Sequence, residues 1–224
     1  MKGISLLGGP LELIPEGFFN ELKYNNKFLL GVDRGSLFLV EKGLTPDVAV
    51  GDFDSLKKAE LAKIEKVVKD IRYSNPVKDL TDSELMIKTA FENYHLTSLK
   101  IYGATGGRLD HFLVNLFTFL KPEFQIYAPK VTLIDRQNVI RLFLPGKHHI
   151  KPLEGYSYLG IVNLTEVKNL SIRGAKYPLE NYTSAYPVSF ASNEFVADKS
   201  VELYFEKGTI AVIYSKDLNR FANL

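Results

Sequence analysis

Over residues 1–130, short apolar runs alternate with segments of helical periodicity. Strands that alternate with helices predict βαβ units and a mostly parallel sheet. Because neighbouring parallel strands need a long crossover connection, usually a helix, this alternation constrains the fold more than any single motif does. We expect strands at residues 3–7, 27–32, 47–50, 66–71, 98–102 and 124–128.

Three helices in this part have recognisable start signals. Residues 81–84, Thr-Asp-Ser-Glu, form a capping box, in which the Thr and Glu side chains each satisfy a free backbone N–H. A second helix is expected over residues 109–120, after a glycine-rich turn. A third helical segment, residues 56–64, follows Ser55, which is a favourable N-cap residue.

After residue 130 the pattern changes to closely spaced strand-like runs without helical periodicity. Such runs, separated by Gly, Pro and Asn, predict an antiparallel β-sandwich. Residues 206–209, Glu-Lys-Gly-Thr, predict a tight hairpin between two of the strands. The expected architecture is therefore an α/β N-terminal domain with a mostly parallel sheet (residues 1–130), followed by an all-β sandwich C-terminal domain (residues 131–224).

Composition excludes several classes of protein. The chain has 224 residues and no Cys, so disulfides and thiolate metal sites are absent. The balance of 28 Lys and Arg against 26 Asp and Glu does not itself decide nucleic-acid binding, but without a long basic run we expect no nucleic-acid partner. The N-terminus lacks the apolar run of a signal peptide, and residues 112–120 are too short to span a bilayer. We expect a cytoplasmic protein without membrane contact.

Acidic residues recur where the expected strands end. Because ligands of parallel sheets bind outside the carboxyl ends of the strands, four loops deliver carboxylates to one edge. Converging carboxylates repel one another unless a cation offsets their charge, and with only four His and no Cys the oxygen ligands favour Mg²⁺ and phosphate over zinc. Asp54-Ser55 has a second interpretation as a helix cap. The acidic residues concerned are Asp33, Asp52, Asp54, Asp79, Asp82 and Asp110.

The stretch GATGGRLDH, residues 103–111, is the second informative motif. Its glycines let backbone N–H groups turn toward an anion, and the N-terminus of the following helix favours phosphate. Arg108 adds a planar donor for phosphate or carboxylate. The alternative is a simple strand-to-helix turn in which Arg108 and Asp110 form an exposed ion pair. The chain has no P-loop, no dinucleotide-binding fingerprint and no nucleophile elbow.

Together these motifs resemble the thiamine pyrophosphokinase family, whose members convert thiamine and ATP to thiamine diphosphate and AMP. The resemblance covers nearly the whole chain and keeps the family order of motifs. In members of the family, an α/β catalytic domain is followed by a thiamine-binding β-sandwich. This order agrees with the two sequence patterns described above. The matching segments are Asp33-Arg34-Gly35, GDFDS (51–55), KDLTD (78–82), GATGGRLDH (103–111), GAKYPL (174–179) and SNEF (192–195).

The resemblance implies roles for individual residues. Metal-binding and catalytic carboxylates would be Asp52, Asp54 and Asp82, with Asp110 also catalytic. Nucleotide-binding residues would be Asp33, Arg34, Lys78, Thr105, Gly106 and Arg108. The thiamine-binding residues would be Tyr177, Ser192 and Asn193, where Tyr177 stands in place of a Trp of animal relatives.

In the reaction that the resemblance implies, the thiamine hydroxyl attacks the β-phosphorus of Mg²⁺-bound ATP. The proton acceptor would be a carboxylate, with Asp82 preferred over Asp79. The family works as a homodimer, which is the expected assembly here. Two alternatives stay open from the residues alone: another Mg²⁺-dependent phosphate-transferring or hydrolysing enzyme, and a catalytically silent thiamine- or nucleotide-binding module.

Overall fold

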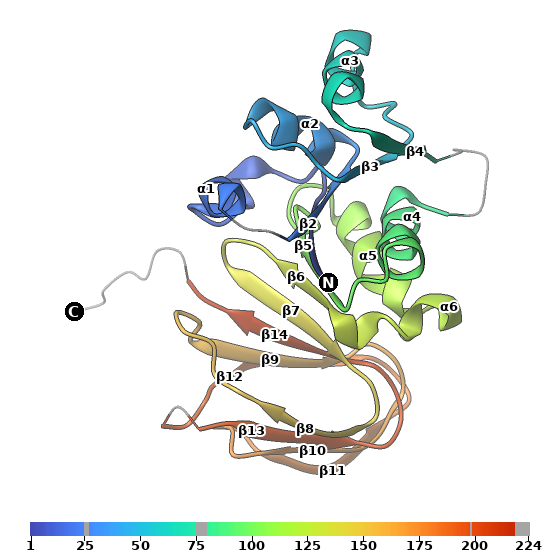
Figure 1. Cartoon of the computed structure of the whole chain (residues 1–224). Coiled ribbons are helices and arrows are strands. Elements are labelled where there is room, and N and C mark those ends of the chain that lie inside the picture. The colour runs from blue at the N-terminus through green and yellow to red at the C-terminus, as the bar shows by residue number, and fades with distance from the viewer. Residues whose placement is uncertain (25–26, 75–79, 198, 218–224) are drawn as a thin grey trace. The chain divides into compact units, whose positions relative to one another are not determined.

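The structure, a computed structural model, describes residues 1–24, 27–74, 80–197 and 199–217 (Figure 1). The chain divides into two compact units, Met1–Arg136 and Gln137–Leu224. The first unit ends at Arg136, past the expected boundary at residue 130, because the strand at residues 131–134 pairs in parallel with its neighbour in the first unit. No helix in the described part of the chain is long and apolar enough to cross a membrane.

In the part of the first unit that the structure describes, six strands pair in parallel, as the alternation of strands and helices predicts. Their order is β6-β5-β1-β2-β3-β4. β2 and β3 are buried along their whole length, which explains why their sequences, FLLGV and VAVG, show no polar alternation. The strands are β1 (Lys2–Leu6), β2 (Phe28–Val32), β3 (Val48–Gly51), β4 (Asp70–Tyr73), β5 (Ser98–Tyr102) and β6 (Val131–Ile134).

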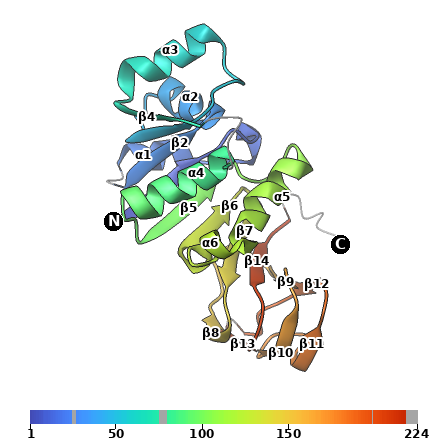
Figure 2. The same cartoon turned by 90° about the vertical axis from the view of Figure 1, so that its right-hand side faces the viewer.

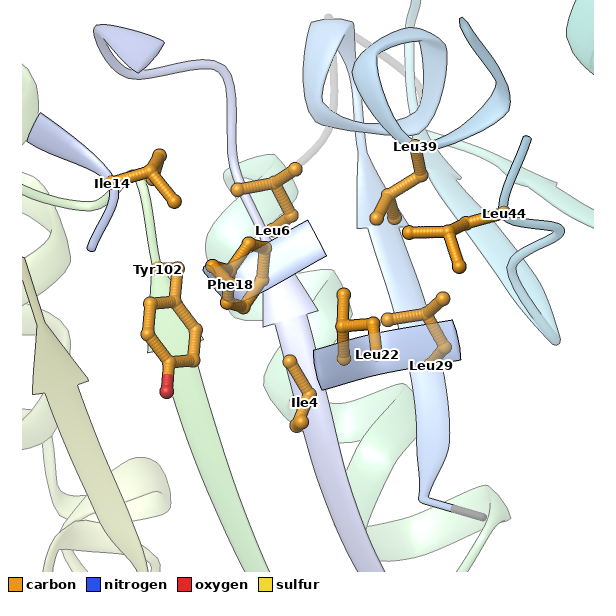
Figure 3. Close-up of a cluster of buried hydrophobic side chains, with 9 residues drawn as sticks. All are labelled: Ile4, Leu6, Ile14, Phe18, Leu22, Leu29, Leu39, Leu44 and Tyr102. Carbon is orange, nitrogen blue, oxygen red and sulfur yellow. The ribbon is translucent and has the colours of Figure 1, made fainter. Parts of the chain in front are cut away.

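Helices connect these strands and pack against the sheet (Figures 1 and 2). Figure 3 shows how the core forms on one face, where Ile4 and Leu6 of β1 meet Phe18 and Leu22 of α1 and Leu39 of α2. The helices are α1 (Phe18–Lys23), α2 (Arg34–Glu41), α3 (Lys58–Val67), α4 (Asp82–Lys88), α5 (Leu109–Phe117) and α6 (Pro122–Gln125). Short helical turns are η1 (Leu11–Leu13), η2 (Thr89–Asn93), η3 (Thr118–Leu120) and η4 (Ala128–Lys130).

The expected start of α4 is confirmed. Thr81 is the N-cap, its hydroxyl accepts a hydrogen bond from Glu84 N, and Thr81 N donates to Glu84 Oε2 at 2.9 Å. By contrast, Ser55 is not the cap of the third helix. That helix, α3, begins at Lys58 with Lys57 as N-cap, because the Glu60 carboxylate accepts from Lys57 N.

Two expected strands differ from the structure. Residues 124–128 form no strand, because Pro122 starts the short helix α6 and the turn η4 follows it. Phe124 and Tyr127 are both buried with a spacing of three residues, so packing in a helical turn overrides their strand propensity. Of residues 66–71, the first two belong to α3 and the strand β4 begins only at Asp70.

The second unit consists of two antiparallel sheets, as expected. One has the order β12-β9-β14-β7 and the other β11-β10-β13-β8. The clean alternation of β13 buries Val201, Leu203 and Phe205. The strands are β7 (Asn138–Phe143), β8 (Gly146–Ile150), β9 (Tyr158–Asn163), β10 (Val167–Arg173), β11 (Leu179–Ser184), β12 (Val188–Asn193), β13 (Val201–Phe205) and β14 (Ile210–Ser215).

The expected hairpin at residues 206–209 is wrong. This segment joins β13 to β14, but β13 pairs with β10 and β8 whereas β14 pairs with β7 and β9. The turn therefore carries the chain from one sheet of the sandwich to the other. Thr209 is fully buried in it, and its N–H donates to Thr165 Oγ1 at 3.0 Å.

Candidate active site

The carboxyl ends of the parallel strands border an open cleft of about 1250 Å³ in the first unit. The sheet has a topological switch point between β1 and β5, since β2 to β4 follow on one side of β1 and β6 follows β5 on the other. Ligands of open α/β sheets bind at such a point. Small-molecule pockets have roughly 300–1,000 Å³, so this cleft has room for a nucleotide.

Among the residues that the structure describes, three carboxylates converge in this cleft. Asp33 follows β2, Asp52 follows β3, and Asp82 is the first residue of α4. Each side chain offers an oxygen, and these oxygens lie within 4.8 Å of one another. All three residues are half-buried, so water screens their repulsion only in part.

The backbone at Asp33 is held in an unusual conformation. Asp33 has a φ of 46°, which L-residues rarely adopt, and its N–H donates to Val50 O at 2.9 Å. Its carboxylate accepts a hydrogen bond from Phe53 N at 3.1 Å. Gly51 makes this contact possible, because a Cβ at position 51 would lie 2.2 Å from Asp33 Oδ1. The β2 and β3 loops therefore fix Asp33 against the GDFDS segment.

The arrangement makes ionisation of the Asp33 carboxyl unfavourable. Burial and the nearby carboxylate of Asp82 raise the pKa of Asp33 from 3.8 to about 7, although the hydrogen bond from Phe53 N acts in the opposite direction. Asp52 contributes to the same increase. A group whose charged form is this unfavourable at neutral pH marks a candidate functional site.

Asp82 is positioned by the start of α4. The Thr81 capping box fixes the first turn of the helix, and Ser74 Oγ donates to Asp82 Oδ1 at 2.5 Å. The Glu84 carboxylate of the same turn is buried and forms an ion pair with Lys121 Nζ at 2.5 Å. The helix terminus is thereby tied both to the end of β4 and to the segment after α5.

Asp54 lines the same cleft but is exposed. Its N–H donates to Asp52 Oδ1 at 3.0 Å, so residues 52–54 form a local turn that orients the Asp52 carboxylate. Among the described residues, the group of three converging carboxylates contains Asp52 and Asp82 together with Asp33, and Asp54 is not part of it.

The glycine-rich turn after β5 also borders the cleft, through Gly103, Gly106 and Gly107. Thr105 is buried beside it and donates from its hydroxyl to Asp135 Oδ2 at 2.6 Å, so the expected nucleotide-binding Thr105 has a partner within the protein. Gly106 is exposed toward solvent. The turn leads directly into α5, whose N-terminus favours anions.

Two arginines line the cleft. Arg108 is exposed and forms a bidentate ion pair with Asp110, with distances of 3.1 Å from Nε and 2.5 Å from Nη2. The hydrogen bond from Arg108 lowers the pKa of Asp110 to about 2. Arg34, at the start of α2, donates from Nη2 to Ser55 O. The exposed pair of Arg108 and Asp110 can open to accept a phosphate at little cost, since such pairs are weak.

The sequence interpretation missed several residues of the cleft. Gly8 and Gly9 follow β1, and Gly9 N donates to Gly103 O at 3.1 Å; a Cβ at position 9 would lie 2.4 Å from that oxygen. In the sequence, the Gly-Gly-Pro just after β1 is the feature that could have indicated a glycine turn at this strand end. Ser83 and Asn115 also line the cleft: Ser83 Oγ donates to Asn115 Oδ1, and Asn115 Nδ2 donates to Ala104 O.

The residues expected to bind thiamine lie in the second unit. Tyr177 is not in a strand but in the loop between β10 and β11, with its side chain exposed. Ser192 and Asn193 end β12; Ser192 is exposed with a φ of 59°, and Asn193 is buried. The Asn193 amide bonds to the backbone of Tyr177. The expected nucleotide-binding Lys78, like Asp79, lies outside the described residues.

Comparison with known proteins gives the site its context. Residues 19–130 match the family description "Thiamin pyrophosphokinase, catalytic domain", and residues 147–210 match "Thiamin pyrophosphokinase, vitamin B1 binding domain". The thiamine pyrophosphokinase of Bacillus subtilis (strain 168) is 35% identical over 225 residues, which is 97% of this chain and 100% of the relative. This chain belongs to the thiamine pyrophosphokinase family.

Solved structures agree with this membership. A thiamin pyrophosphokinase family protein from Enterococcus faecalis is 36% identical with a TM-score of 0.88, covering 97% of this chain and 100% of that one. A protein from Lactobacillus plantarum is 40% identical with a TM-score of 0.87, covering 97% and 99%. The resemblance based on motifs and the predicted fold class are thus confirmed.

For this thiamine pyrophosphokinase family member, the Asp33 pKa predicts a distinctive pH dependence of stability without metal. The folded-state pKa lies above the unfolded value, so Asp33 contributes stability below pH 4 that is lost as the pH rises toward 7. Asp33→Asn keeps the acceptor for Phe53 N and removes the charge. With allowance for partial exposure, the variant should gain on the order of 2 kcal/mol over wild type at pH 8 and little at pH 4.

Urea unfolding in EDTA at pH 4 to 8 measures this difference, with Glu12→Gln, at an exposed acidic position, as the control. If the free energy of unfolding depended on pH in the same way in wild type and in Asp33→Asn, the raised pKa of Asp33 would be contradicted. Mg²⁺ added at pH 8 should stabilise the wild type more than the variant.

Proposed function

We propose that this chain transfers the diphosphate group of ATP to the hydroxyl of thiamine, giving thiamine diphosphate and AMP. Family membership supports the reaction, and one observation carries the proposal for the site. Asp33, Asp52 and Asp82 converge within 4.8 Å in a cleft that also contains the two glycine loops of the switch point. A phosphate-binding turn beside clustered carboxylates suits a nucleotide that carries a divalent cation.

The nucleotide phosphates would lie against the turn at residues 103–107 and the N-terminus of α5. Backbone N–H groups there, and the Arg108 side chain, would neutralise phosphate charge. Thr105 would act by holding the turn in place through its bond to Asp135. We assign Arg34 and Gly106 to the same nucleotide site, because both line the cleft.

The converging carboxylates fit Mg²⁺. The donor set consists of oxygens only, and it comes from three backbone segments fixed by strand ends and a helix cap. A raised Asp33 pKa is the expected sign of a carboxylate group that a cation would stabilise. When bound, Mg²⁺ would offset the negative charge of the phosphates. We propose Asp52 and Asp82 as ligands, with Asp33 beside them and Asp54 as a further acidic residue of the site.

The chain's own contribution to the reaction is mainly positioning and charge balance, as in phosphoryl transfer generally. The thiamine hydroxyl attacks the β-phosphorus in line with the bond to AMP, and that bond breaks. Asp82 accepts the hydroxyl proton, and Asp110 keeps the Arg108 guanidinium oriented until phosphate replaces it. We assign thiamine recognition to the β-sandwich unit, residues 137–224, and catalysis to the α/β unit, residues 1–136. The homodimer and the cytoplasmic location stay predictions.

A single assay tests the proposed reaction. Incubation with ATP, Mg²⁺ and thiamine should give AMP and thiamine diphosphate in equal amounts. ADP would indicate a simple kinase, inorganic phosphate a hydrolase, and no nucleotide product a silent binding module. Family membership does not favour these alternatives.

Asp52→Asn should reduce kcat by roughly 100-fold or more, because it removes a charge that the metal and phosphates require. Asp54→Asn should also lower activity strongly, because it removes a further negative charge from the same cleft. The rates are measured over a range of Mg²⁺ concentrations, with circular dichroism as the check on folding. Near wild-type activity of Asp52→Asn at limiting Mg²⁺ would overturn the metal assignment.

Arg108→Ala should raise the KM for ATP roughly tenfold and change the KM for thiamine much less, because the lost hydrogen bonds go to phosphate. Arg108→Lys should rescue only in part, since Lys lacks the planar fork. Arg136→Ala, which removes an exposed arginine paired with Glu16, is the control and should change neither constant. An unchanged ATP dependence in Arg108→Ala would exclude this role.

A further inference from the structure

A β-bulge decides which way Asn193 points. In the pairing of β12 with β9, Phe190 is opposite Ile161 and Asn193 is opposite Leu159, so β12 has one extra residue in this interval. Ser192 lies in this interval, and its φ of 59° is the local change of backbone conformation that accommodates the extra residue. Since side chains alternate along a strand, the bulge turns Asn193 to the inside, where only 3% of its surface is exposed.

The buried Asn193 amide is occupied by the chain itself. Its Oδ1 accepts from Tyr177 N and from Glu194 N, both at 2.9 Å, and its Nδ2 donates to Tyr177 O at 2.8 Å. An asparagine amide has two acceptor sites and two donor hydrogens. Both acceptor sites and one of the two donor hydrogens are therefore used. A 4-amino group of a pyrimidine finds no acceptor on this side chain, and with 3% of Asn193 exposed the remaining hydrogen has little access to a ligand.

Further contacts attach the Tyr177 loop to the same segment. Ala175 forms an antiparallel bridge with Phe195, and Lys176 N donates to Glu194 O at 3.0 Å. The Lys176 side chain pairs with Glu194 at 2.7 Å, and its Nζ lies 5.6 Å from the centre of the Tyr177 ring. The backbone of Tyr177 is thus fixed at both its N–H and its C=O, whereas the residue as a whole is 58% exposed.

We propose that Asn193 is a positioning residue that presents the Tyr177 ring to thiamine and does not contact thiamine itself. This inference rests on the proposed function and on thiamine binding by the second unit. An aromatic face attracts a cationic heteroaromatic ring, but only if the ring is held where the ligand arrives. Asn193 provides that hold from the interior, and the bulge at Ser192 is what allows it to do so.

A double-mutant cycle tests the proposal with KM values for thiamine and ATP in wild type, Asn193→Ala, Tyr177→Ala and the double variant. Tyr177→Ala and Asn193→Ala should each raise the thiamine KM about tenfold, in the range that a lost cation–π contact allows, and change the ATP KM less than twofold. In the Tyr177→Ala background, Asn193→Ala should add less than twofold.

Asn163→Ala is the matched control. Asn163 is also buried in the second unit, and its amide similarly holds a turn by donating to Thr165 O and Tyr186 O and accepting from Val188 N. It should lower the unfolding temperature as Asn193→Ala does and leave the thiamine KM within twofold of wild type. This comparison separates lost stability from lost positioning.

Amide hydrogen exchange adds a readout that does not depend on activity. In wild type the Tyr177 N–H should be protected although it lies in an exposed loop, and Asn193→Ala should remove that protection. Should Asn193→Ala fail to fold, Asn193→Asp keeps the acceptors for Tyr177 N and Glu194 N but loses the donor to Tyr177 O. It should therefore keep part of the protection and raise the thiamine KM less than Tyr177→Ala does.

Three results would overturn the proposal. If Asn193→Ala raised the thiamine KM by the same factor in wild type and in Tyr177→Ala, Asn193 would contact thiamine directly. An unchanged thiamine KM in Tyr177→Ala would mean that this ring does not receive thiamine. Rapid exchange of the Tyr177 N–H in wild type would mean that the hydrogen bonds from the Asn193 amide do not hold the Tyr177 backbone in place. If the wild type forms no AMP, the proposed function is refuted. Hydrogen exchange at the Tyr177 N–H then still decides whether Asn193 holds the Tyr177 backbone.

Discussion

Mutual repulsion among Asp33, Asp52 and Asp82 is the constraint on which the rest of the site depends. Carboxylate oxygens within 4.8 Å of one another, only partly open to water, are unfavourable when all are charged. The fold tolerates this because each residue is attached to an element that cannot move away: the ends of β2 and β3, and the capped start of α4. This arrangement lowers the stability of the fold, and a bound cation would offset the repulsion.

The sheet topology brings glycine-rich backbone to the same place. The loops after β1 and β5 meet at the switch point, where Gly9 N bonds to Gly103 O. The chain of hydrogen bonds from Ser83 through Asn115 to Ala104 then joins the start of α4 to the turn that leads into α5. The carboxylates and the glycine-rich turn are thereby held in a fixed relation across one cleft, which is the arrangement that the proposed metal–nucleotide site needs.

Local signals predicted much of this arrangement, and non-local packing determined the rest. The capping box at residues 81–84 depends on four adjacent residues, and the sequence predicted it correctly. Residues 124–128 have strand-forming side chains but are helical, because Pro122 and the core set their conformation. The strand-end pattern placed Asp33 correctly at the acidic edge. Single-sequence patterns do not reveal its backbone conformation and its hydrogen bond from Phe53 N, nor the bulge on which the burial of Asn193 depends.

The central claim, that these three carboxylates form a cation site, is tested most directly by crystals grown with Mn²⁺ and ATP. Mn²⁺ shares the oxygen-ligand preference of Mg²⁺ and is visible by anomalous scattering. The account predicts an anomalous peak at bonding distance, about 2.1 Å, from an oxygen of at least two of Asp33, Asp52 and Asp82. A crystal in which Mn²⁺ binds the nucleotide but contacts none of these carboxylates would contradict it.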